Sequence, residues 1–363
     1  MRAKTFACCS AIVLLVALLI AIPALAQETK DRIIAFDATP NSTLTYPVSI
    51  NSRGEITGYF VDANGLHGFL REPLGHVIIF DAPEAIQNAI DGTHPSGIND
   101  WGEITGWFQS MSGTYGFLRD RDGTISTFQV SNYPTTPLAI NTRGEVSGWY
   151  LGATGARGFL RHKHGAITTF DVNGINGVFP VSINNDGQIA GYYYLDRAYS
   201  FVRNENGEIK TFEAPGAGPT GNNSGGTFAM GINARGEIAG YYREASGIFH
   251  GYFRTTHGKV ISLDLSSIET LATGINSSGE VIGWFLDAAS EILGFVRSPR
   301  GTIITFGAGF RGIDPLAINA IGEITGFVYD SNNKTRGFVR KADPYQWIRN
   351  EFPDRDEDRD HRN

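Results

Sequence analysis

The stretch INSRGEITGYF, Ile50–Phe60, decides the fold because the chain repeats it seven times with small changes. The copies start 42 to 49 residues apart, and a fixed period in this range is typical of repeat architectures. In chain order they are INSRGEITGYF (Ile50–Phe60), INDWGEITGWF (Ile98–Phe108), INTRGEVSGWY (Ile140–Tyr150), INNDGQIAGYY (Ile183–Tyr193), INARGEIAGYY (Ile232–Tyr242), INSSGEVIGWF (Ile275–Phe285) and INAIGEITGFV (Ile318–Val328).

Each repeat unit contains four short strand-like runs, and no useful helical periodicity interrupts them. In the first unit these runs are Pro47–Asn51, Glu55–Phe60, Leu66–Arg71 and Val77–Asp81. The Asn-x-x-Gly between the first two runs predicts a type I turn closed by a bulge, in which Asn bonds to nearby backbone and Gly adopts a positive φ. The unit is therefore expected to be a four-stranded antiparallel sheet.

Two further regularities concern side chains. We expect Glu55 to lie opposite Arg71 on the neighbouring strand, an ion pair worth ~0.2–1 kcal/mol that most units repeat. We also expect two aromatic positions per unit to form the core between sheets. The first position holds Tyr59, Trp107, Trp149, Tyr192, Tyr241, Trp284 and Phe327, and the second holds Phe69, Phe117, Phe159, Phe201, Tyr252, Phe295 and Phe338.

The two ends of the repeat array complement each other. The last unit stops after Gly337–Arg340 without a fourth run, whereas Ile33–Asp37 near the start resembles the fourth run Val77–Asp81. Pairing of Ile33–Asp37 with Phe338–Arg340 would complete the last sheet, and only an array that closes on itself requires it. The sequence thus predicts an all-β, seven-bladed β-propeller of four-stranded blades, closed by an N-terminal strand that completes the last blade.

The units also resemble a known repeat. His67-Gly68-Phe69-Leu70 and His250-Gly251-Tyr252-Phe253 are similar to the His-Ala-Phe motif of the bacterial extracellular HAF-repeat family, and the resemblance covers residues 31–341. It implies an exported, β-propeller-like repeat protein and brings no catalytic residues with it.

Composition indicates export and argues against several classes of function. Arg2 and Lys4, an apolar run and Ala24-Leu25-Ala26 predict a cleaved signal peptide, residues 1–26, and hence a secreted or periplasmic bacterial protein. Both cysteines lie in that segment, so the mature chain is expected to lack disulfides and thiolate metal sites. The net charge is −7 with no long basic stretch, which argues against a nucleic-acid partner. No later segment is apolar enough to span a membrane.

The expected domain organisation is a propeller over residues 27–341 followed by an extension over 342–363. In that extension Tyr345, Trp347, Ile348 and Phe352 could dock on the ring, and the charged end is expected to be disordered. We expect a monomer without a cofactor or metal.

Candidate binding residues occupy one position of the first strand, immediately before its first Pro or Ala. This position varies although its neighbours repeat, and it should lie at the mouth of the central channel on the face with the variable loops. Its occupants are Tyr46, His94, Thr136, Phe179, Phe228, Leu271 and Asp314. One interpretation is drift at an unconstrained position. The other is an aromatic pocket formed by Tyr46, Phe179 and Phe228 with His94 and Asp314 as its polar groups, which would suit a sugar or another amphipathic ligand.

Three functions remain open at this point. The first is an exported binding or interaction module that recognises a glycan or an envelope partner on its variable-loop face. The second is a carbohydrate-active hydrolase or lyase at the channel mouth, for which His94 and Asp314 are the only acid/base pair available. The third is a purely structural envelope protein. No catalytic motif is recognisable, so the sequence favours a protein that is not an enzyme.

Overall fold

The computed structural model describes residues 33–88, 91–219, 225–266, 268–343 and Trp347. The elements within these residues are 28 β-strands, and none of the elements is a helix, which confirms the all-β prediction. Nowhere in the described chain is there a helix with the length and apolarity to cross a membrane. The predicted signal peptide and the charged end of the chain, 348–363, lie outside the described residues.

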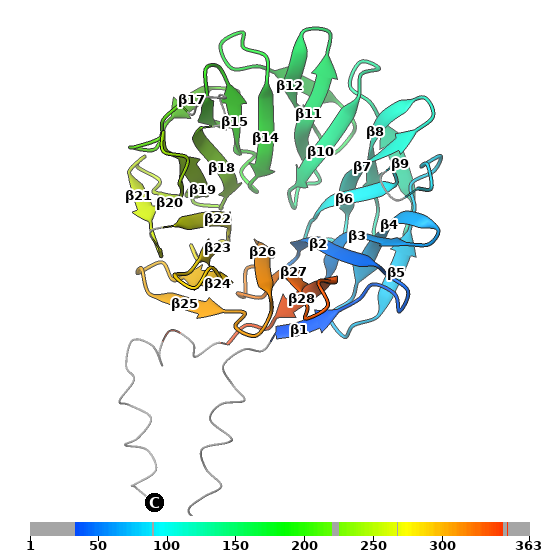
Figure 1. The fold of residues 1–363 in the computed structure, drawn as a ribbon. Coiled ribbons are helices and arrows are strands. Elements are labelled where there is room, and N and C mark those ends of the chain that lie inside the picture. The colour runs from blue at the N-terminus through cyan, green and yellow to red at the C-terminus, as the bar shows by residue number, and fades with distance from the viewer. Residues whose placement is uncertain (1–32, 89–90, 220–224, 267, 344–346, 348–363) are drawn as a thin grey trace, which may run out of the picture. The chain divides into compact units, whose positions relative to one another are not determined.

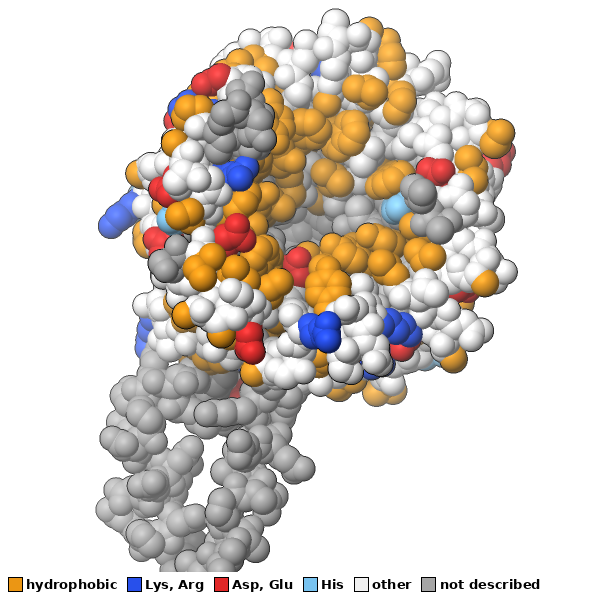
Figure 2. Space-filling view, viewed as in Figure 1, with side chains coloured by type: hydrophobic (Ala, Val, Ile, Leu, Met, Phe, Trp, Pro, Cys, Tyr) orange, Lys and Arg blue, Asp and Glu red, His pale blue; other side chains and the backbone are white. Residues whose placement is uncertain are grey.

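The first repeat unit is a four-stranded antiparallel sheet in which each strand pairs with the next along the chain. Its strands are β2 (Leu44–Ile50), β3 (Ile56–Asp62), β4 (Gly65–Arg71) and β5 (Val77–Phe80). The turn between β2 and β3 has Gly54 at a φ of +76°, as the Asn-x-x-Gly pattern predicts. The sheets are arranged around a common centre with the first strand of each unit innermost (Figure 1), and the space-filling view shows a hollow there (Figure 2).

The same unit recurs through most of the chain. The second and third units are β6 (Thr93–Ile98), β7 (Ile104–Ser110), β8 (Gly113–Arg119) and β9 (Ile125–Phe128), then β10 (Thr135–Ile140), β11 (Val146–Gly152), β12 (Gly155–Arg161) and β13 (Ile167–Phe170). The fourth and fifth are β14 (Val178–Ile183), β15 (Ile189–Tyr194), β16 (Ala198–Arg203) and β17 (Ile209–Phe212), then β18 (Gly226–Ile232), β19 (Ile238–Arg243), β20 (Phe249–Arg254) and β21 (Val260–Leu263). The sixth is β22 (Glu269–Ile275), β23 (Val281–Leu286), β24 (Ile292–Arg297) and β25 (Ile303–Phe306).

The last unit combines both ends of the described chain. Its strands β26 (Gly312–Ile318), β27 (Ile324–Tyr329) and β28 (Thr335–Arg340) are followed by β1 (Ile33–Phe36), which pairs antiparallel with β28. In this pairing Phe36 lies opposite Gly337, and a Cβ atom on Gly337 would be 2.7 Å from the Phe36 ring. Glycine at this position therefore makes room for the ring of the N-terminal strand.

The core lies between neighbouring sheets and is built from the second aromatic position. Its seven occupants, Phe69 in the first unit and its equivalents, are all 0% exposed, which confirms this part of the prediction. Each hydrophobic cluster draws on two consecutive units, as where Phe80 of the first packs with Phe117 of the second. A single sheet could not bury these rings alone, so each sheet depends on its neighbours for its stability.

The first aromatic position was wrongly predicted as core. Tyr59 and most of its equivalents are only half-buried, whereas the next residue, Phe60, is 1% exposed. Successive side chains of a strand point to opposite faces, so Phe60 enters the core and Tyr59 points away from it. Tyr59 and its equivalents therefore lie on the face of the second strand that points away from the core.

The expected register between the second and third strands is wrong by one residue. Ile56, and not Glu55, lies opposite Arg71. The two strands are joined by a two-residue turn in which Asp62 lies opposite Gly65, and a turn of this length sets the offset of the whole hairpin. The predicted cross-strand ion pair consequently does not form.

Both charged groups have other partners. The Arg71 guanidinium lies 4.7 Å from the ring centre of Phe36, a cation–π contact that recurs for the equivalent arginines of the other units. The Glu55 carboxylate accepts hydrogen bonds from Asn51 Nδ2 at 2.6 Å and from Arg53 at 2.6 Å. Arg71 thus packs over an aromatic ring of a fourth strand. Glu55 stabilises the turn of its own unit through hydrogen bonds.

Candidate functional site

Seven pairs of side chains, which we call the aromatic collar, surround the central hollow near the start of the innermost strands. Each pair joins the candidate residue of a first strand to the first aromatic position of the second strand, directly opposite it in register. The pairs are Tyr46/Tyr59, His94/Trp107, Thr136/Trp149, Phe179/Tyr192, Phe228/Tyr241, Leu271/Trp284 and Asp314/Phe327. Hydrophobic side chains gather around the hollow in the space-filling view (Figure 2).

A glycine in each second strand brings the collar pairs together. Gly58 precedes Tyr59, and a Cβ atom at this position would lie 2.2 Å from the carbonyl oxygen of Tyr46. Only a residue without a side chain lets the second strand approach the first this closely. The repeated glycine is therefore a packing requirement that sets the two rings beside each other.

Five collar side chains form a continuous stack, the first arc. Its ring centroids are separated by 3.9 Å between Trp107 and His94, 5.2 Å between His94 and Tyr59, 5.0 Å between Tyr59 and Tyr46, and 4.6 Å between Tyr46 and Phe327. The imidazole of His94 is nearly parallel to the Trp107 indole, at 6°. The arc crosses three units, so its shape depends on how those units pack.

A second arc crosses the next three units. Its centroid separations are 5.6 Å between Trp149 and Phe179, 5.4 Å between Phe179 and Tyr192, 5.1 Å between Tyr192 and Phe228, and 4.9 Å between Phe228 and Tyr241. Phe228 and Phe327 are buried at 6% exposed, whereas the other arc rings are half-buried, so the collar presents partly exposed aromatic surface over much of its circumference.

Tyr194 belongs to this arc although it was not predicted as a site residue. It is 38% exposed, and its ring contacts those of Phe179, Tyr192 and Phe228 at 5.7 to 6.4 Å. It lies two residues after Tyr192 on β15, and therefore on the same face of that strand. The two-residue period was the signal that could have identified it.

The phenol groups of the collar are held neutral. Burial raises the pKa of Tyr241 to about 12, and burial is also the main cause that raises the pKa values of Tyr46, Tyr59 and Tyr192. A neutral phenol can both donate and accept a hydrogen bond. The rings consequently combine apolar faces with polar edges.

Asp314 is the only acidic member of the collar. It is half-buried, and its Oδ1 atom is fully buried without a hydrogen-bond partner among the described residues. Burial raises the pKa of this carboxyl to about 7, since removal from water disfavours the charged form. Asp314 is close enough to Tyr46 to contribute to the raised pKa of that phenol.

The structure therefore brings the five proposed binding residues into one collar, in two groups. Tyr46 and His94 meet through Tyr59 in the first arc, and Asp314 lies opposite Phe327 at the end of that arc. Phe179 and Phe228 meet through Tyr192 in the second arc. Thr136 and Leu271 interrupt the aromatic surface between the arcs. Whether any of these residues binds a ligand stays a prediction.

The opposite end of the innermost strands is polar. A cavity of about 270 Å³ is lined there by the Ile-Asn-x tripeptides of all seven units. Asn51 lies five residues after Tyr46, which places this cavity roughly 16 Å along the strand from the collar. The two ends of the hollow therefore differ in chemistry.

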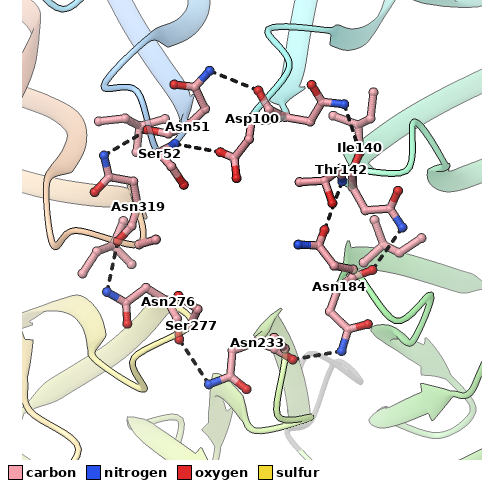
Figure 3. Close-up of a pocket in the computed structure, with 18 of the residues that line it drawn as sticks. Asn51, Ser52, Asp100, Ile140, Thr142, Asn184, Asn233, Asn276, Ser277 and Asn319 are labelled. Atoms are coloured by element: carbon pink, nitrogen blue, oxygen red, sulfur yellow. Dashed lines mark hydrogen bonds between the residues drawn. The ribbon is translucent and has the colours of Figure 1, made fainter.

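The asparagines of these tripeptides link each unit to the next (Figure 3). The Nδ2 atom of Asn51 donates to the carbonyl oxygen of Asn99 at 3.0 Å, and the same bond recurs from unit to unit at 2.9 to 3.1 Å. The last one runs from Asn319 back to the carbonyl of Asn51 at 2.9 Å. The Asn side chain is thus a link between sheets as well as a turn residue.

Each asparagine also positions the acidic or amide residue four positions later. In the third unit, burial alone would raise the pKa of Glu145, but hydrogen bonds from Asn141 and Arg143 outweigh it. The pKa of this carboxyl is therefore held below its usual range. The described residues contain no group of three or more His, Cys, Asp or Glu side chains that could hold a metal ion.

Two tryptophans outside the collar donate indole hydrogen bonds to neighbouring units. Trp101, in a turn at the polar end, is 61% exposed and donates from Nε1 to the carbonyl of Thr142 in the next unit at 2.8 Å. Trp347 donates from Nε1 to Glu280 Oε1 at 2.7 Å and packs against the core of the last unit. Tyr345, Ile348 and Phe352 lie outside the described residues.

No protein-family model matches the chain, and no curated protein matches it in sequence. Solved structures do resemble it. A streptogramin B lyase matches with a TM-score of 0.59 at 13% identity, covering 85% of this chain and 97% of the lyase. A catalytically inactive virginiamycin B lyase from Staphylococcus aureus with quinupristin matches with a TM-score of 0.58 at 14% identity, covering 85% and 99%. At such low identity the likeness shows a propeller-like β-repeat fold and nothing of the chemistry.

Proposed function

We propose that this chain is an exported, closed seven-bladed β-propeller that binds a glycan or another amphipathic ligand at the aromatic collar. The observation that carries the proposal is the pair of aromatic arcs around an open hollow. Rings that are half-buried instead of packed in the core retain apolar surface for a ligand, and their phenol and indole groups can orient it. A purely structural ring would have no need of partly exposed aromatic stacks at this position.

The closed form of the ring is supported by two sets of contacts. β1 pairs with β28, so the N-terminal strand covers an edge that would otherwise leave backbone groups unpaired. The Asn319–Asn51 hydrogen bond joins the last repeat to the first. The proposed organisation is a signal peptide over residues 1–26, the propeller over 27–341 and an extension over 342–363.

Export and family are part of the same proposal. We assign the chain to the HAF-repeat proteins on the strength of its motif and place it outside the cytoplasmic membrane, secreted or periplasmic, as a monomer. N-terminal sequencing of the protein recovered from a bacterial host tests this: export with cleavage should give a mature chain that begins at Gln27. Retention of Met1 on the cytosolic protein would refute it.

Binding is tested with a glycan array followed by titrations of intrinsic fluorescence. Trp149→Ala removes one end of the second arc, and loss of one ring contact of about 1–1.5 kcal/mol weakens binding roughly tenfold. Trp101→Ala is the matched control, since this exposed indole lies at the polar end. Absence of any ligand on the array, or equal affinity of wild type and Trp149→Ala for the ligand found, would refute the collar as the site.

A second candidate is a hydrolase or lyase acting on carbohydrate. The observation that favours it is the carboxyl of Asp314, whose pKa of about 7 would let it act as a general acid near neutral pH. Its proposed partner His94 lies at the other end of the Tyr46–Tyr59 stack. Turnover of a glycan panel that persists after both residues are changed to Ala would exclude this pair.

A further inference from the structure

Asp314 differs from acidic side chains that directly follow a fourth strand of the ring. Glu213 is paired with Arg197, Asp171 with Arg157 and Asp37 with Lys334. Among the described residues, Asp314 takes part in no ion pair and its buried Oδ1 accepts no hydrogen bond. An unpaired carboxylate removed from water is costly, so folds tend to retain one only where something compensates for it.

The neighbours of Asp314 offer aromatic surface on both sides. Tyr46 of the first unit lies on one side, stacked on Phe327. On the other side is the sixth unit, whose strand β23 packs against β26 and carries Trp284. Within the described part of the chain the Trp284 indole stacks on no other aromatic ring, and because it is half-buried, part of its surface is accessible. Aromatic faces attract cations, and tryptophan does so most strongly.

The charged side chains of the collar also favour a positively charged ligand. The collar contains no Lys or Arg, and its single basic side chain is His94. Burial is the cause of the raised pKa of Asp314, with no neighbouring cation opposing it. The carboxylate is therefore an uncompensated negative charge in a largely apolar ring.

We infer that the collar binds a ligand bearing an organic cation, a protonated amine or quaternary ammonium on an amphipathic body, with Asp314 as its counter-ion and Trp284 and Tyr46 as flanking aromatic surfaces. This rests on the proposed function, because it names the class of ligand for the same collar. Ligand binding then supplies the missing partner of Asp314, and the cation exchanges water for a carboxylate and ring faces.

Choline and its neutral isostere 3,3-dimethylbutan-1-ol differ only in the charged nitrogen and are suitable probes. By isothermal titration at pH 8.5, wild-type protein should bind choline at least tenfold more tightly than the alcohol. Asp314→Asn should abolish this preference, and Asp122→Asn, at an exposed turn far along the sheet from the collar, should retain it. Equal affinity for the two probes, or a preference that survives in Asp314→Asn, would overturn the inference.

A pH series on folded wild-type protein tests the same point should Asp314→Asn fail to fold. Choline affinity should fall several-fold between pH 8.5 and 5.5 as the carboxyl takes up a proton, while affinity for the alcohol stays constant. His94 is the single basic side chain of the collar, so a His94→Gln series runs in parallel and should show the same fall. The other ionisable groups on strands packed against β26 are Tyr46, Tyr329, Glu269 and Arg297. Of these, Arg297 lies over the ring of Phe253.

The outcomes separate this inference from the proposed function. A glycan or neutral amphipath that binds and is weakened by Trp149→Ala, with no preference for choline, leaves the proposed function standing and overturns the cation inference. Failure of every neutral and cationic ligand to bind overturns both.

Discussion

Replacing Asn141 by Ala should destabilise the fold far more than a comparable change in an ordinary turn. Its Nδ2 atom donates to the Asn184 carbonyl at 3.1 Å and to Glu145 Oε2 at 2.8 Å. Its Oδ1 atom accepts from the backbone N–H groups of Arg143 and Glu145, both at 3.0 Å. Alanine removes all four bonds and leaves a carbonyl of the next unit without its donor.

The magnitude follows from these bonds. At about 1 kcal/mol for each buried hydrogen bond, with about 1 kcal/mol more for the orphaned carbonyl, the loss is about 5 kcal/mol. Asn204 is a matched control, because it begins the same Asn-x-x-Gly turn between a third and a fourth strand. Among the described residues its side chain bonds only to Glu208, through Nδ2 and Oδ1 at 2.9 Å each, in an exposed turn. Asn204→Ala should therefore cost about 1 kcal/mol.

Urea unfolding followed by tryptophan fluorescence measures both variants against wild type. The midpoint should fall much further for Asn141→Ala, with a similar slope for all three proteins if they unfold in one step. If the two variants lost equal free energy within ~0.5 kcal/mol, the link between units would contribute nothing beyond the local turn. That result would refute the reasoning.

Three further predictions concern the same scaffold. The depressed pKa of Glu145 supplies stability that is present above the pKa of an unfolded glutamate and is lost as the pH falls below that value through the folded one. Urea midpoints should therefore drop in buffer more acidic than the ordinary pKa of glutamate, and Glu145→Gln should flatten that dependence; an unchanged slope would contradict it. Gly148→Ala should lower the free energy of unfolding by more than about 3 kcal/mol or prevent folding, because a Cβ atom there would lie 2.3 Å from a backbone oxygen. The control Gly97→Ala, where the nearest atom would be 3.4 Å away, should cost under about 1 kcal/mol in the same denaturation assay. Similar losses in the two variants would show that close approach of the strands is not the cause. A chain beginning at Thr39, which lacks β1, should be several kcal/mol less stable or should aggregate. A chain beginning at Lys30 should behave as the full mature chain in thermal melts and gel filtration. Equal stability and elution of the two shortened chains would argue against the closed ring.

The repeat, its four strands and its turns could be predicted because their signals are local. Asn51 and Gly54 predict the turn, and the alternation of apolar and polar residues on either side predicts the strands. The register between the second and third strands of a unit could not be predicted from such local signals. In most units the glutamate lies three residues before one glycine and the arginine three residues after the other, as Glu55 and Arg71 do around Gly58 and Gly68. A register shifted by one residue satisfies this repetition equally well, and the hairpin turn, between Asp62 and Gly65 in the first unit, decides between them.

The candidate site shows the same limit. The first-strand position of Tyr46 stood out because it varies among repeated neighbours. Its partner Tyr59 did not, since Tyr59 and Phe60 are adjacent aromatics and the sequence does not say which of them faces the core. The burial of Asp314 likewise depends on packing against the first unit, which lies far from it in sequence.

The pairing of β1 with β28 also has a consequence for the order in which the molecule can form. The hydrogen bond from Asn319 to Asn51 joins residues separated by 268 positions, and the N-terminal strand must wait for the last strand to become available. Early units can form their hairpins as the chain emerges, but the final contacts carry a large loop-closure cost. Until that moment β28 has one unpaired edge, and a second chain in the same state offers a matching strand. Folding of this protein should therefore be most vulnerable to exchange of β1 between neighbouring molecules at high concentration.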